Sequence, residues 1–384
     1  RRFGEILIGL QNNTLSRADL LNETGVAKNV HYGDVLIKFG EVLDVSKEKL
    51  PMISDESILS KYKSSFLQNG DIIVADTAED STVGKCSEIA GLNDEIVLSG
   101  LHTIPYRPIE KFASGYLGYY LNSSAYHNQL IPLMQGIKVT SISKSAMQDT
   151  DIVYPKSVEE QGKIGDYFQS LDNLITLHQK KCEQLTILKK YMLQKMFPQN
   201  GSDKPEIRFE GFTDDWEQRK VSEIGNIVTG STPKTSISDN YGGEFLFVSP
   251  ADIQENRYVD ETLTTLTKKG FDQGRKIREK ASLFVSIGST IGKVAQTSQE
   301  STTNQQINAV EPYDNFDDDF IFTSLENISG SIKAIASNQA VPIVNKTTFG
   351  QTEIQVPSEL AEQQKIGAYF RKLDHLITLH QQKC

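Results

Sequence analysis

The sequence predicts an α+β protein in which two mixed domains are joined by two long helices. A 23-residue segment occurs twice, at residues 160–182 and 362–384, with 17 identical positions. In both copies the apolar residues recur at alternating intervals of four and three, which is typical of a packed helix. Short β-rich runs between Gly-, Asn- and Ser-rich loops fill the remainder of each half. We therefore expect a pseudo-two-fold repeat of one domain followed by one helix.

The first domain is expected over residues 1–155. Its runs at 71–75 and 95–98 are rich in β-branched residues and are bounded by Gly, Asn and Ser, as short buried strands are. The tetrapeptide Thr82–Lys85 returns in altered form as Thr290–Lys293. The internal repeat therefore extends, weakly, from the helices into the domains.

The central repeated helix is expected over residues 156–197, since Pro155 precedes it, Pro198 follows it and no proline lies between. Its heptad-like apolar stripe must be buried against another element. The second copy is the obvious partner, so we expect an antiparallel coiled coil; the alternative is that each helix lies on its own domain. The packing residues would be Ile164, Phe168, Leu171, Ile175 and Leu185 in the first helix and Ile366, Phe370, Leu373 and Ile377 in the second.

A polar segment with Gly and Ser separates the halves, and we expect a linker over residues 198–218. The second domain is expected over 219–357, with strand-like runs at 245–248 and 282–286. The C-terminal repeated helix is expected over 358–384. Because the first copy continues for some 14 residues beyond the matching position, we expect this last helix to be truncated.

The composition restricts the class of protein. No apolar run approaches the roughly 18 residues of a membrane-spanning helix, and three cysteines in 384 residues fit a reducing compartment, so we expect a cytoplasmic protein without a membrane partner. The net charge of −10 argues against a broadly basic surface. Any contact with nucleic acid must therefore be a local patch on an acidic body.

Motifs of catalysis are absent from the sequence. Residues 288–294 contain Gly and Gly-Lys but not the spacing or final hydroxyl of a phosphate-binding loop. There is no Asn-Pro-Pro-aromatic tetrapeptide, H-E-x-x-H or C-x-x-C. We therefore expect no catalytic residues in this chain.

The repeat contains a possible metal site. His178 and Cys182 are four residues apart on one helix face, and His380 and Cys384 repeat the spacing. Antiparallel packing could bring two His and two Cys together as a tetrahedral zinc set. We favour the alternative that they are ordinary residues of the packed seam, and we expect no metal.

The repeated segments resemble a known family. Glu160-Gln161, Lys163-Ile164 and Leu171-Asp172, with the equivalent residues 202 positions later, resemble the conserved helices of the specificity (S) subunit, HsdS, of type I restriction-modification systems. Residues 205–216, with Pro205, Phe209 and Trp216, resemble the segment that precedes a target-recognition domain in that family. The resemblance covers nearly the whole chain and is weakest in the first domain.

The resemblance implies two target-recognition domains that each read one half of a split, asymmetric site in double-stranded DNA, with the paired helices as a spacer. It implies a non-catalytic subunit that binds two methyltransferase (M) subunits and restriction/translocase (R) subunits. No cofactor is expected on this chain, since S-adenosylmethionine and ATP with Mg²⁺ would bind to the partner subunits.

Candidate DNA contacts follow from the residue types that contact phosphates and base edges. Six basic residues lie within thirteen positions of the second domain, for which a solvated charged loop is the alternative. The candidates of the second domain are Ser231, Thr232, Lys234, Lys268, Lys269, Arg275, Lys276, Arg278, Lys280, Ser289, Thr290, Lys293, Asn304, Gln305 and Gln306. Those of the first domain are Asn12, Asn13, Arg17, Lys61, Lys63, Ser81, Thr82, Lys85, His102 and Lys138.

Two other functions remain open at this point. A coiled-coil adaptor with two ligand-binding lobes would have the same architecture but no dependence on DNA sequence. The specificity part of a single-chain restriction-methylation enzyme is the other alternative, and the missing methyltransferase motifs argue against a whole enzyme of that kind.

Overall fold

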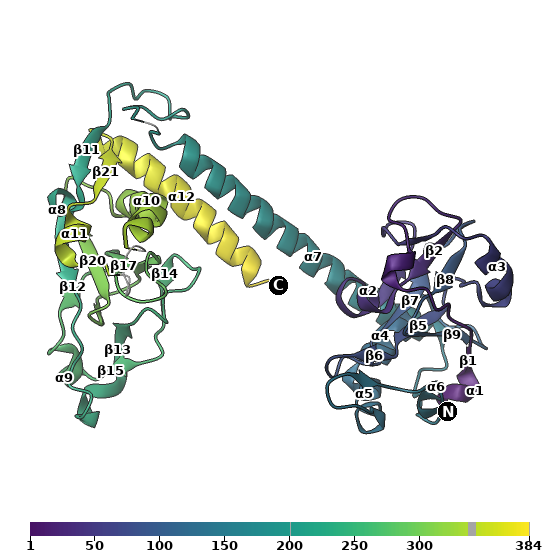
Figure 1. Ribbon diagram of the computed structural model, residues 1–384. Helices are drawn as coiled ribbons and strands as arrows, with labels where there is room; N and C mark the ends of the chain where they lie inside the picture. The colour runs from purple at the N-terminus through teal and green to yellow at the C-terminus, as the bar shows by residue number, and fades with distance from the viewer. Residues whose placement is uncertain (200, 337–342, 384) are drawn as a thin grey trace. The chain divides into compact units, whose positions relative to one another are not determined.

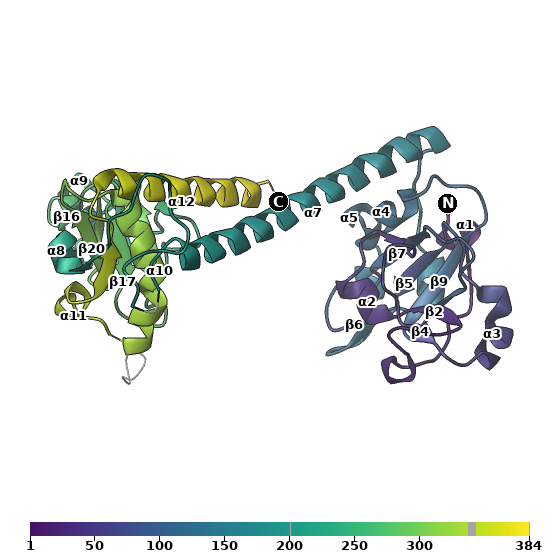
Figure 2. The same cartoon turned by 90° about the horizontal axis from the view of Figure 1, so that it is seen from above.

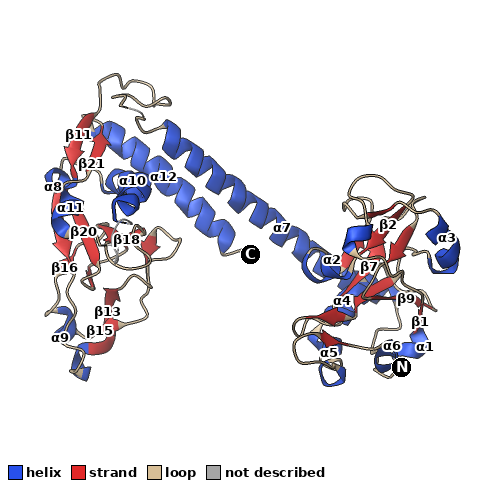
Figure 3. Cartoon of the chain, in the orientation of Figure 1, coloured by secondary structure: helices blue, strands red, loops and turns tan. Residues whose placement is uncertain are grey.

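The structure is a computed structural model that describes residues 1–199, 201–336 and 343–383. The chain divides into two compact units, Arg1–Leu174 and Ile175–Cys384, and each is described by itself (Figure 1). Both units combine strands and helices, which confirms the predicted α+β class (Figure 3). In the described part of the chain, no helix is long and apolar enough to cross a membrane.

The first unit is built on a five-stranded sheet in the order β1-β9-β5-β7-β3. Its first three pairings are antiparallel and the last is parallel. A second sheet has the order β4-β2-β8, and β6 pairs with β10. The strands are β1 (Leu7–Gly9), β2 (Ala27–Val30), β3 (Val42–Asp44), β4 (Met52–Ile53), β5 (Ile72–Ala75), β6 (Thr77–Ala78), β7 (Cys86–Ala90), β8 (Val97–Ser99), β9 (Thr103–Pro108) and β10 (Thr140–Ser141).

Short helices cover this sheet and close its core. Phe3, Tyr106 and Tyr126 pack together in that core, with Phe3 and Tyr106 meeting edge to face at 4.7 Å. The helices are α1 (Phe3–Ile6), α2 (Tyr32–Ile37), α3 (Ser57–Tyr62), α4 (Tyr116–Asn122), α5 (Ser124–His127) and α6 (Lys144–Gln148), with 3₁₀ turns at Arg17–Asp19, Lys63–Ser65 and Ile131–Leu133.

The second unit repeats this topology with a different sequence. Its five-stranded sheet has the order β12-β20-β17-β18-β14, again with three antiparallel pairings and a final parallel one. A second sheet has the order β15-β13-β19-β16, and β11 pairs with β21. The strands are β11 (Glu217–Lys220), β12 (Gly225–Thr229), β13 (Tyr241–Val248), β14 (Tyr258–Val259), β15 (Thr265–Leu266), β16 (Lys276–Ile277), β17 (Ser282–Val285), β18 (Val294–Thr297), β19 (Ser301–Thr303), β20 (Ile307–Pro312) and β21 (Glu353–Val356).

The weakly repeated tetrapeptides Thr82–Lys85 and Thr290–Lys293 form the same turn in the two sheets. Gly84 and Gly292 both have a positive φ, 88° and 92°, between matching strands of the two units. A residue with a Cβ rarely adopts this backbone conformation, so glycine is favoured at both turns. Val83 and Ile291, which precede them, are both buried.

The helices of the second unit include one long buried element, α10 (Asp318–Ala336), which packs against α12 (Leu360–Gln381) (Figure 1). The helix α7 (Val158–Lys195) has 38 residues, about 57 Å at 1.5 Å per residue. It begins in the first unit and ends in the second. The remaining helices are α8 (Val221–Ile224), α9 (Lys268–Phe271) and α11 (Lys346–Gly350), with a 3₁₀ turn at Ser238–Asn240.

The predicted antiparallel helix pair is confirmed. His178 of α7 contacts His380 of α12, and eleven residues further along α7 Lys189 contacts Asp374, six residues earlier in α12. The two helices run side by side in opposite directions in both views (Figures 1 and 2). Residues at matching positions of the repeat, the two histidines, therefore meet each other.

Candidate nucleic-acid interface

The same glutamine fixes each copy of the repeat to its own domain. The amide of Gln161 donates to the carbonyl of the proline six residues earlier (2.8 Å) and accepts from the backbone N–H of Ala113 (3.1 Å). Gln363 makes the equivalent two bonds, at 3.0 Å each, the second from the N–H of Asp317. Both glutamines are buried. The Gln of the Glu-Gln motif therefore sets how each helix leaves its domain.

The Glu of the motif has different surroundings in the two copies. Glu362 is buried and accepts two hydrogen bonds of 2.8 Å from Arg208, and this ion pair raises the pKa of the guanidinium. Trp216, further along the same segment, packs edge to face against Phe197 at 5.7 Å. The segment before the second domain thus covers the start of α12, whereas Glu160 at the matching position of α7 is exposed.

The repeated aspartate of the second copy lies in a buried ionic network. Arg257 donates to Asp319 and Asp374, both at 2.9 Å, and its guanidinium lies 4.3 Å from the centre of the Phe322 ring. Lys189 reaches Asp374 from α7 at 2.6 Å. Because Arg257 is only 5% exposed, its charge has to be matched inside the protein. Arg257 lies directly before β14, so the network joins this strand to α7, α10 and α12.

The repeated aspartate of the first copy has an aromatic partner instead. Asp172 accepts a hydrogen bond of 2.6 Å from the hydroxyl of Tyr119, whose ring stacks on Phe168 at 5.5 Å. Burial and the hydrogen bond to the carboxylate raise the pKa of Tyr119. Asp172 itself is exposed. The repeated aspartate thus holds its helix to the domain through a tyrosine hydroxyl in the first copy and through buried ion pairs in the second.

The predicted packing residues of the helices divide into two groups. Leu185, Ile366, Phe370 and Leu373 are buried in one cluster, with Ile377 partly buried against it. Ile175 is half-buried. Ile164 packs partly buried against the core of the first domain.

Phe168 and Leu171 correct the expected seam. They are 44% and 37% exposed, whereas their counterparts Phe370 and Leu373 are 0% and 6% exposed. The expectation that Leu171 is buried between the helices is therefore wrong. Phe370 and Leu373 share one buried cluster with Leu185 of α7 and with Phe320 and Leu325 of α10, the helix that packs against α12.

Two of the first-domain candidates line one polar cleft of about 510 Å³. Asn12 and Lys61 lie on its walls together with Asp76 and Lys144. Lys61, Lys63, Ser81, Thr82, His102 and Lys138 are all exposed. His102 has a positive φ of 56°, lies 3.4 Å from Asp76 and packs against Tyr32.

Other first-domain candidates are held by contacts inside the domain. Asn13 is 1% exposed and donates to the side chain of Asn29 and the carbonyl of Ser99. Arg17 pairs with Asp34 at 2.6 Å. The ammonium of Lys85 donates to the carbonyl of Leu36 at 2.9 Å, and that of Lys293 in the second domain donates to the carbonyl of Ile253 at 3.0 Å. Such contacts fix turns and leave fewer donors for a ligand.

Two candidate motifs of the second domain come together in the structure. The hydroxyl of Thr232 donates to the side chain of Gln305 at 2.5 Å, and the backbone N–H of Ser231 donates to Thr303. The N–H of Arg275 donates to the hydroxyl of Ser231 at 3.2 Å. Lys234, Ser289 and Gln305 are exposed, and Thr290, Asn304 and Gln306 are half-buried. These loops place amides, hydroxyls and basic groups at one end of β12 and β20.

The basic cluster of the second domain is largely ion-paired. Lys268 and Lys276 both contact Asp272, at 3.0 and 2.8 Å, and Lys269 contacts Asp239. The guanidinium of Arg278 binds both carboxylate oxygens of Asp318. Lys280 has a positive φ of 62°. Most of the six charges are therefore matched by neighbouring carboxylates, which lowers the positive potential that the sequence suggests.

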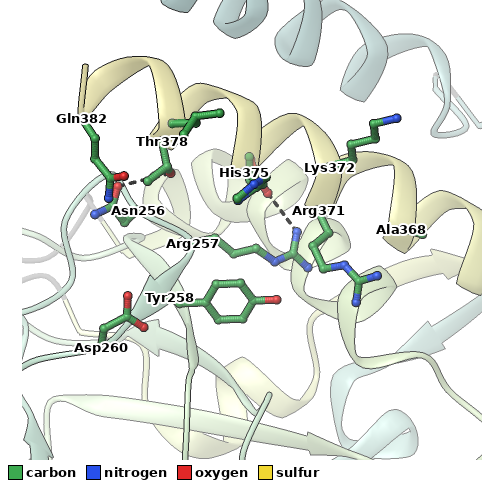
Figure 4. A pocket seen from close by; sticks show the side chains of 12 residues that line it. Asn256, Arg257, Tyr258, Asp260, Ala368, Arg371, Lys372, His375, Thr378 and Gln382 are labelled. Atoms are coloured by element: carbon green, nitrogen blue, oxygen red, sulfur yellow. Dashed lines mark hydrogen bonds and ion pairs between the residues drawn. The ribbon is translucent and has the colours of Figure 1, made fainter. Parts of the chain in front are cut away.

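Sequence reasoning missed several polar residues that line clefts. Lys144 belongs to the cleft of the first domain, and Arg371, Lys372 and His375 line a cleft of about 720 Å³ beside α12 (Figure 4). A signal for the latter three was present in the sequence, because each lies where the two copies of the repeat differ.

The possible zinc site at His178, Cys182, His380 and Cys384 lies partly outside the described residues. The Nδ1 atoms of His178 and His380 are 2.8 Å apart, so the two histidines do meet as the pseudo-symmetry suggested. Cys384 is not among the described residues. Within the described ranges, no group of three or more His, Cys, Asp and Glu side chains is arranged to hold a metal ion.

Known proteins are similar to this chain in sequence and in fold. The model of the family described as "Type I restriction modification DNA specificity domain" matches residues 25–186 and again 213–384. The HindI specificity subunit of Haemophilus influenzae is 32% identical over 164 residues, which are 41% of this chain and 36% of that protein. The MjaX specificity subunit of Methanocaldococcus jannaschii, described as putative, is 24% identical over 361 residues, 90% of this chain and 78% of that protein.

The chain spans little more than a third of the length of two of these relatives. The match covers 36% of the HindI subunit and 39% of the MjaIX specificity subunit of M. jannaschii. Among solved structures, the S subunit of a type I restriction-modification system from M. genitalium superposes over 100% of this chain and 91% of its own, with a TM-score of 0.67 and 13% identity. A chain of a type I restriction-modification complex gives a TM-score of 0.53 at 16% identity, over 100% of this chain and 92% of its own. These likenesses support the fold. Because the family model matches both halves and most of the sequence, the chain belongs to the family of type I restriction-modification specificity subunits.

Proposed function

We propose that the chain reads a bipartite, asymmetric site in double-stranded DNA, with one domain for each half-site. The observation that carries the proposal is the repetition of one sheet topology in two domains whose loops carry different polar residues. A shared scaffold with divergent loops is suited to two independent readings of base edges. The first domain would use the cleft with Asn12 and Lys61, and the second the loops around Ser231 and Gln305.

The partners in this proposal supply the chemistry. Two methyltransferase subunits with S-adenosylmethionine would dock on the helices, and restriction subunits with ATP and Mg²⁺ would join them in the cytoplasm. The chain itself would bind no cofactor and catalyse no reaction. The identical positions of the two repeats support docking of two identical subunits, since identical partners require matching surfaces.

Methylome sequencing of cells with and without the chain tests the reading of DNA. A split methylated motif should be present only with the chain. Replacing residues 206–350 by the corresponding domain of another specificity subunit should change the bases of one half and leave the other half unchanged. A motif that does not depend on the chain, or a change in both halves, would contradict the proposal.

The spacing between half-sites tests the role of α7. Insertion of four residues after Leu174 adds about 6 Å and slightly more than one helical turn. This position lies before Leu185 and Lys189, so the part of α7 that packs with α12 is left unchanged. The non-specific spacer should lengthen by about one or two base pairs, with the same bases in each half. If the length of the non-specific spacer does not change, α7 does not set the distance between the half-sites.

A further inference from the structure

A cleft of about 720 Å³ lies between α12 and the residues that lead into β14 (Figure 4). Its volume falls within the ordinary range of ligand sites. Asn256, Arg257, Tyr258 and Asp260 form one wall. The other wall is α12, which contributes Ala368, Arg371, Lys372, Asp374, His375, Thr378, Leu379 and Gln382. None of the candidates drawn from the sequence lies in this cleft.

The α12 wall is where the two repeats diverge. The copies differ at six of 23 positions, and five of those six positions in the second copy line the cleft. The first copy has Asp166, Gln169, Ser170, Asn173 and Lys180 where the second has Ala368, Arg371, Lys372, His375 and Gln382. Positions that serve both halves alike are identical, so this face serves a role that is particular to the second domain.

The divergence makes the face more basic. One acidic residue is lost at Ala368 and two cations are gained at Arg371 and Lys372, while one lysine is lost where Gln382 replaces Lys180, so the face gains two positive charges in all. In the first unit the residue before β3 is Glu41, in the place that Arg257 holds before β14. At these two places the first unit therefore carries the carboxylates Glu41 and Asp166, where the second carries Arg257 and the uncharged Ala368.

The cations on the α12 wall remain available to a ligand. Arg257 lies in the opposite wall, and its donors are used by Asp319, Asp374 and Gln296. Arg371 shares Asp319 with it at 2.9 Å and is 46% exposed at its side chain. Among the described residues, no ion pair or hydrogen bond involves the side chains of Lys372 or His375.

We propose that this cleft binds the phosphodiester backbone of DNA beside the second half-site. The inference rests on the proposed reading of DNA and deepens it, because it assigns an asymmetric phosphate contact to the helix rather than to the recognition loops. Arg371 and Lys372 supply the charge, and Asn256, Thr378 and Gln382 supply uncharged polar groups that gather at one end of the cleft (Figure 4). Phosphate contacts fix position without reading sequence.

The repeat provides its own test variant. Arg371→Gln with Lys372→Ser gives α12 the residues that α7 already carries at the matching exposed positions, and both residues are therefore compatible with a helix of this sequence. Asp319 keeps Arg257 as a partner. The matched control, Lys180→Gln with Lys190→Gln, removes two charges from exposed positions of α7 that are not among the identical positions of the repeat.

The measurement is binding of a duplex with the methylated motif to the complex purified with the chain, over a series of salt concentrations. The test variant should bind at least fivefold more weakly at ~0.1 M salt, and the slope of log K against log salt should fall by about 1.8, the value for two lost phosphate contacts. The half-site bases should not change, and the control should keep the original slope.

Each other outcome has a separate meaning. An unchanged affinity and slope in the test variant, or an equal loss in the control, overturns the phosphate contact while the reading of DNA stands. Loss of the copurifying subunits with unchanged DNA binding by what remains makes the cleft a protein dock and also overturns it. If the unmodified complex shows no preference for the motif, the proposed function itself fails.

Discussion

The two halves of this chain share a sheet topology and a nearly identical helix, yet they hold that helix by different forces. In the second half, Asp374 is buried among Arg257 and Lys189, and Phe370 is fully covered. In the first half, Asp172 is exposed and bonded by Tyr119, and Phe168 is 44% exposed. The same residues are thus core in one copy and surface in the other, which teaches that a repeated sequence fixes a helix but not its environment.

The largest expected difference concerns the repeated leucine. Leu373→Asp places a carboxylate in a cluster where the leucine is 6% exposed, and it should lower the free energy of unfolding of the second unit by at least about 3 kcal/mol. Leu171→Asp changes a residue that is 37% exposed and should cost about 1 kcal/mol or less. Urea denaturation of both variants checks this, and equal losses would show that the two copies have equivalent surroundings.

The second comparison is between the two attachments of the repeated aspartate. Arg257→Met leaves two buried carboxylates with one cation each and should destabilise the second unit by about 3 kcal/mol. Tyr119→Phe removes one hydrogen bond to the exposed Asp172 and should cost about 1 kcal/mol or less. Hydrogen exchange of α12 and of the start of α7 measures each effect locally. A larger effect in the first unit would reverse the comparison.

The third prediction concerns the contact that both halves share. Gln161→Ala and Gln363→Ala each remove two hydrogen bonds from a buried amide and leave a backbone N–H without its acceptor, at a cost of about 1–3 kcal/mol. Because the geometry is the same, the two losses should agree within about 0.5 kcal/mol. Thermal or urea unfolding of each unit checks this, and clearly unequal losses would mean that surroundings outweigh the shared bonds.

The smallest expected effect is a dependence on pH at the histidine pair. Desolvation and the neighbouring His178, Lys383 and Lys181 lower the pKa of His380. The unfolded chain then binds the proton more readily, so the stability of the helix pair is full above the ordinary pKa near 6.5 and decreases as the pH falls below it. His380→Gln should make the stability of the helix pair depend less on pH between about pH 7 and 5. Thermal unfolding of the helices, measured at several pH values, checks this. A steeper decrease in the variant would contradict this.

The sequence by itself determined the α+β class, the internal repeat and the antiparallel pairing of the helices. A near-identical segment of 23 residues and a heptad-like stripe leave few other arrangements for two amphipathic helices. The sequence also predicted strands at 71–75 and 282–286, which the structure has at Ile72–Ala75 and Ser282–Val285, because short runs of β-branched residues between turn formers have few alternatives. These features depend on local pattern, which a sequence displays directly.

Only the tertiary structure decided which of those residues are buried and which cations are free. Leu171 and Leu373 look the same in the sequence, but Leu373 lies in a buried cluster that includes residues of α10 and of a distant part of α7. The basic cluster around Lys268 and Arg278 looks like a nucleic-acid patch until Asp272 and Asp318 are seen to pair with it. Burial and ion pairing depend on contacts between residues far apart along the chain, and no local pattern encodes them.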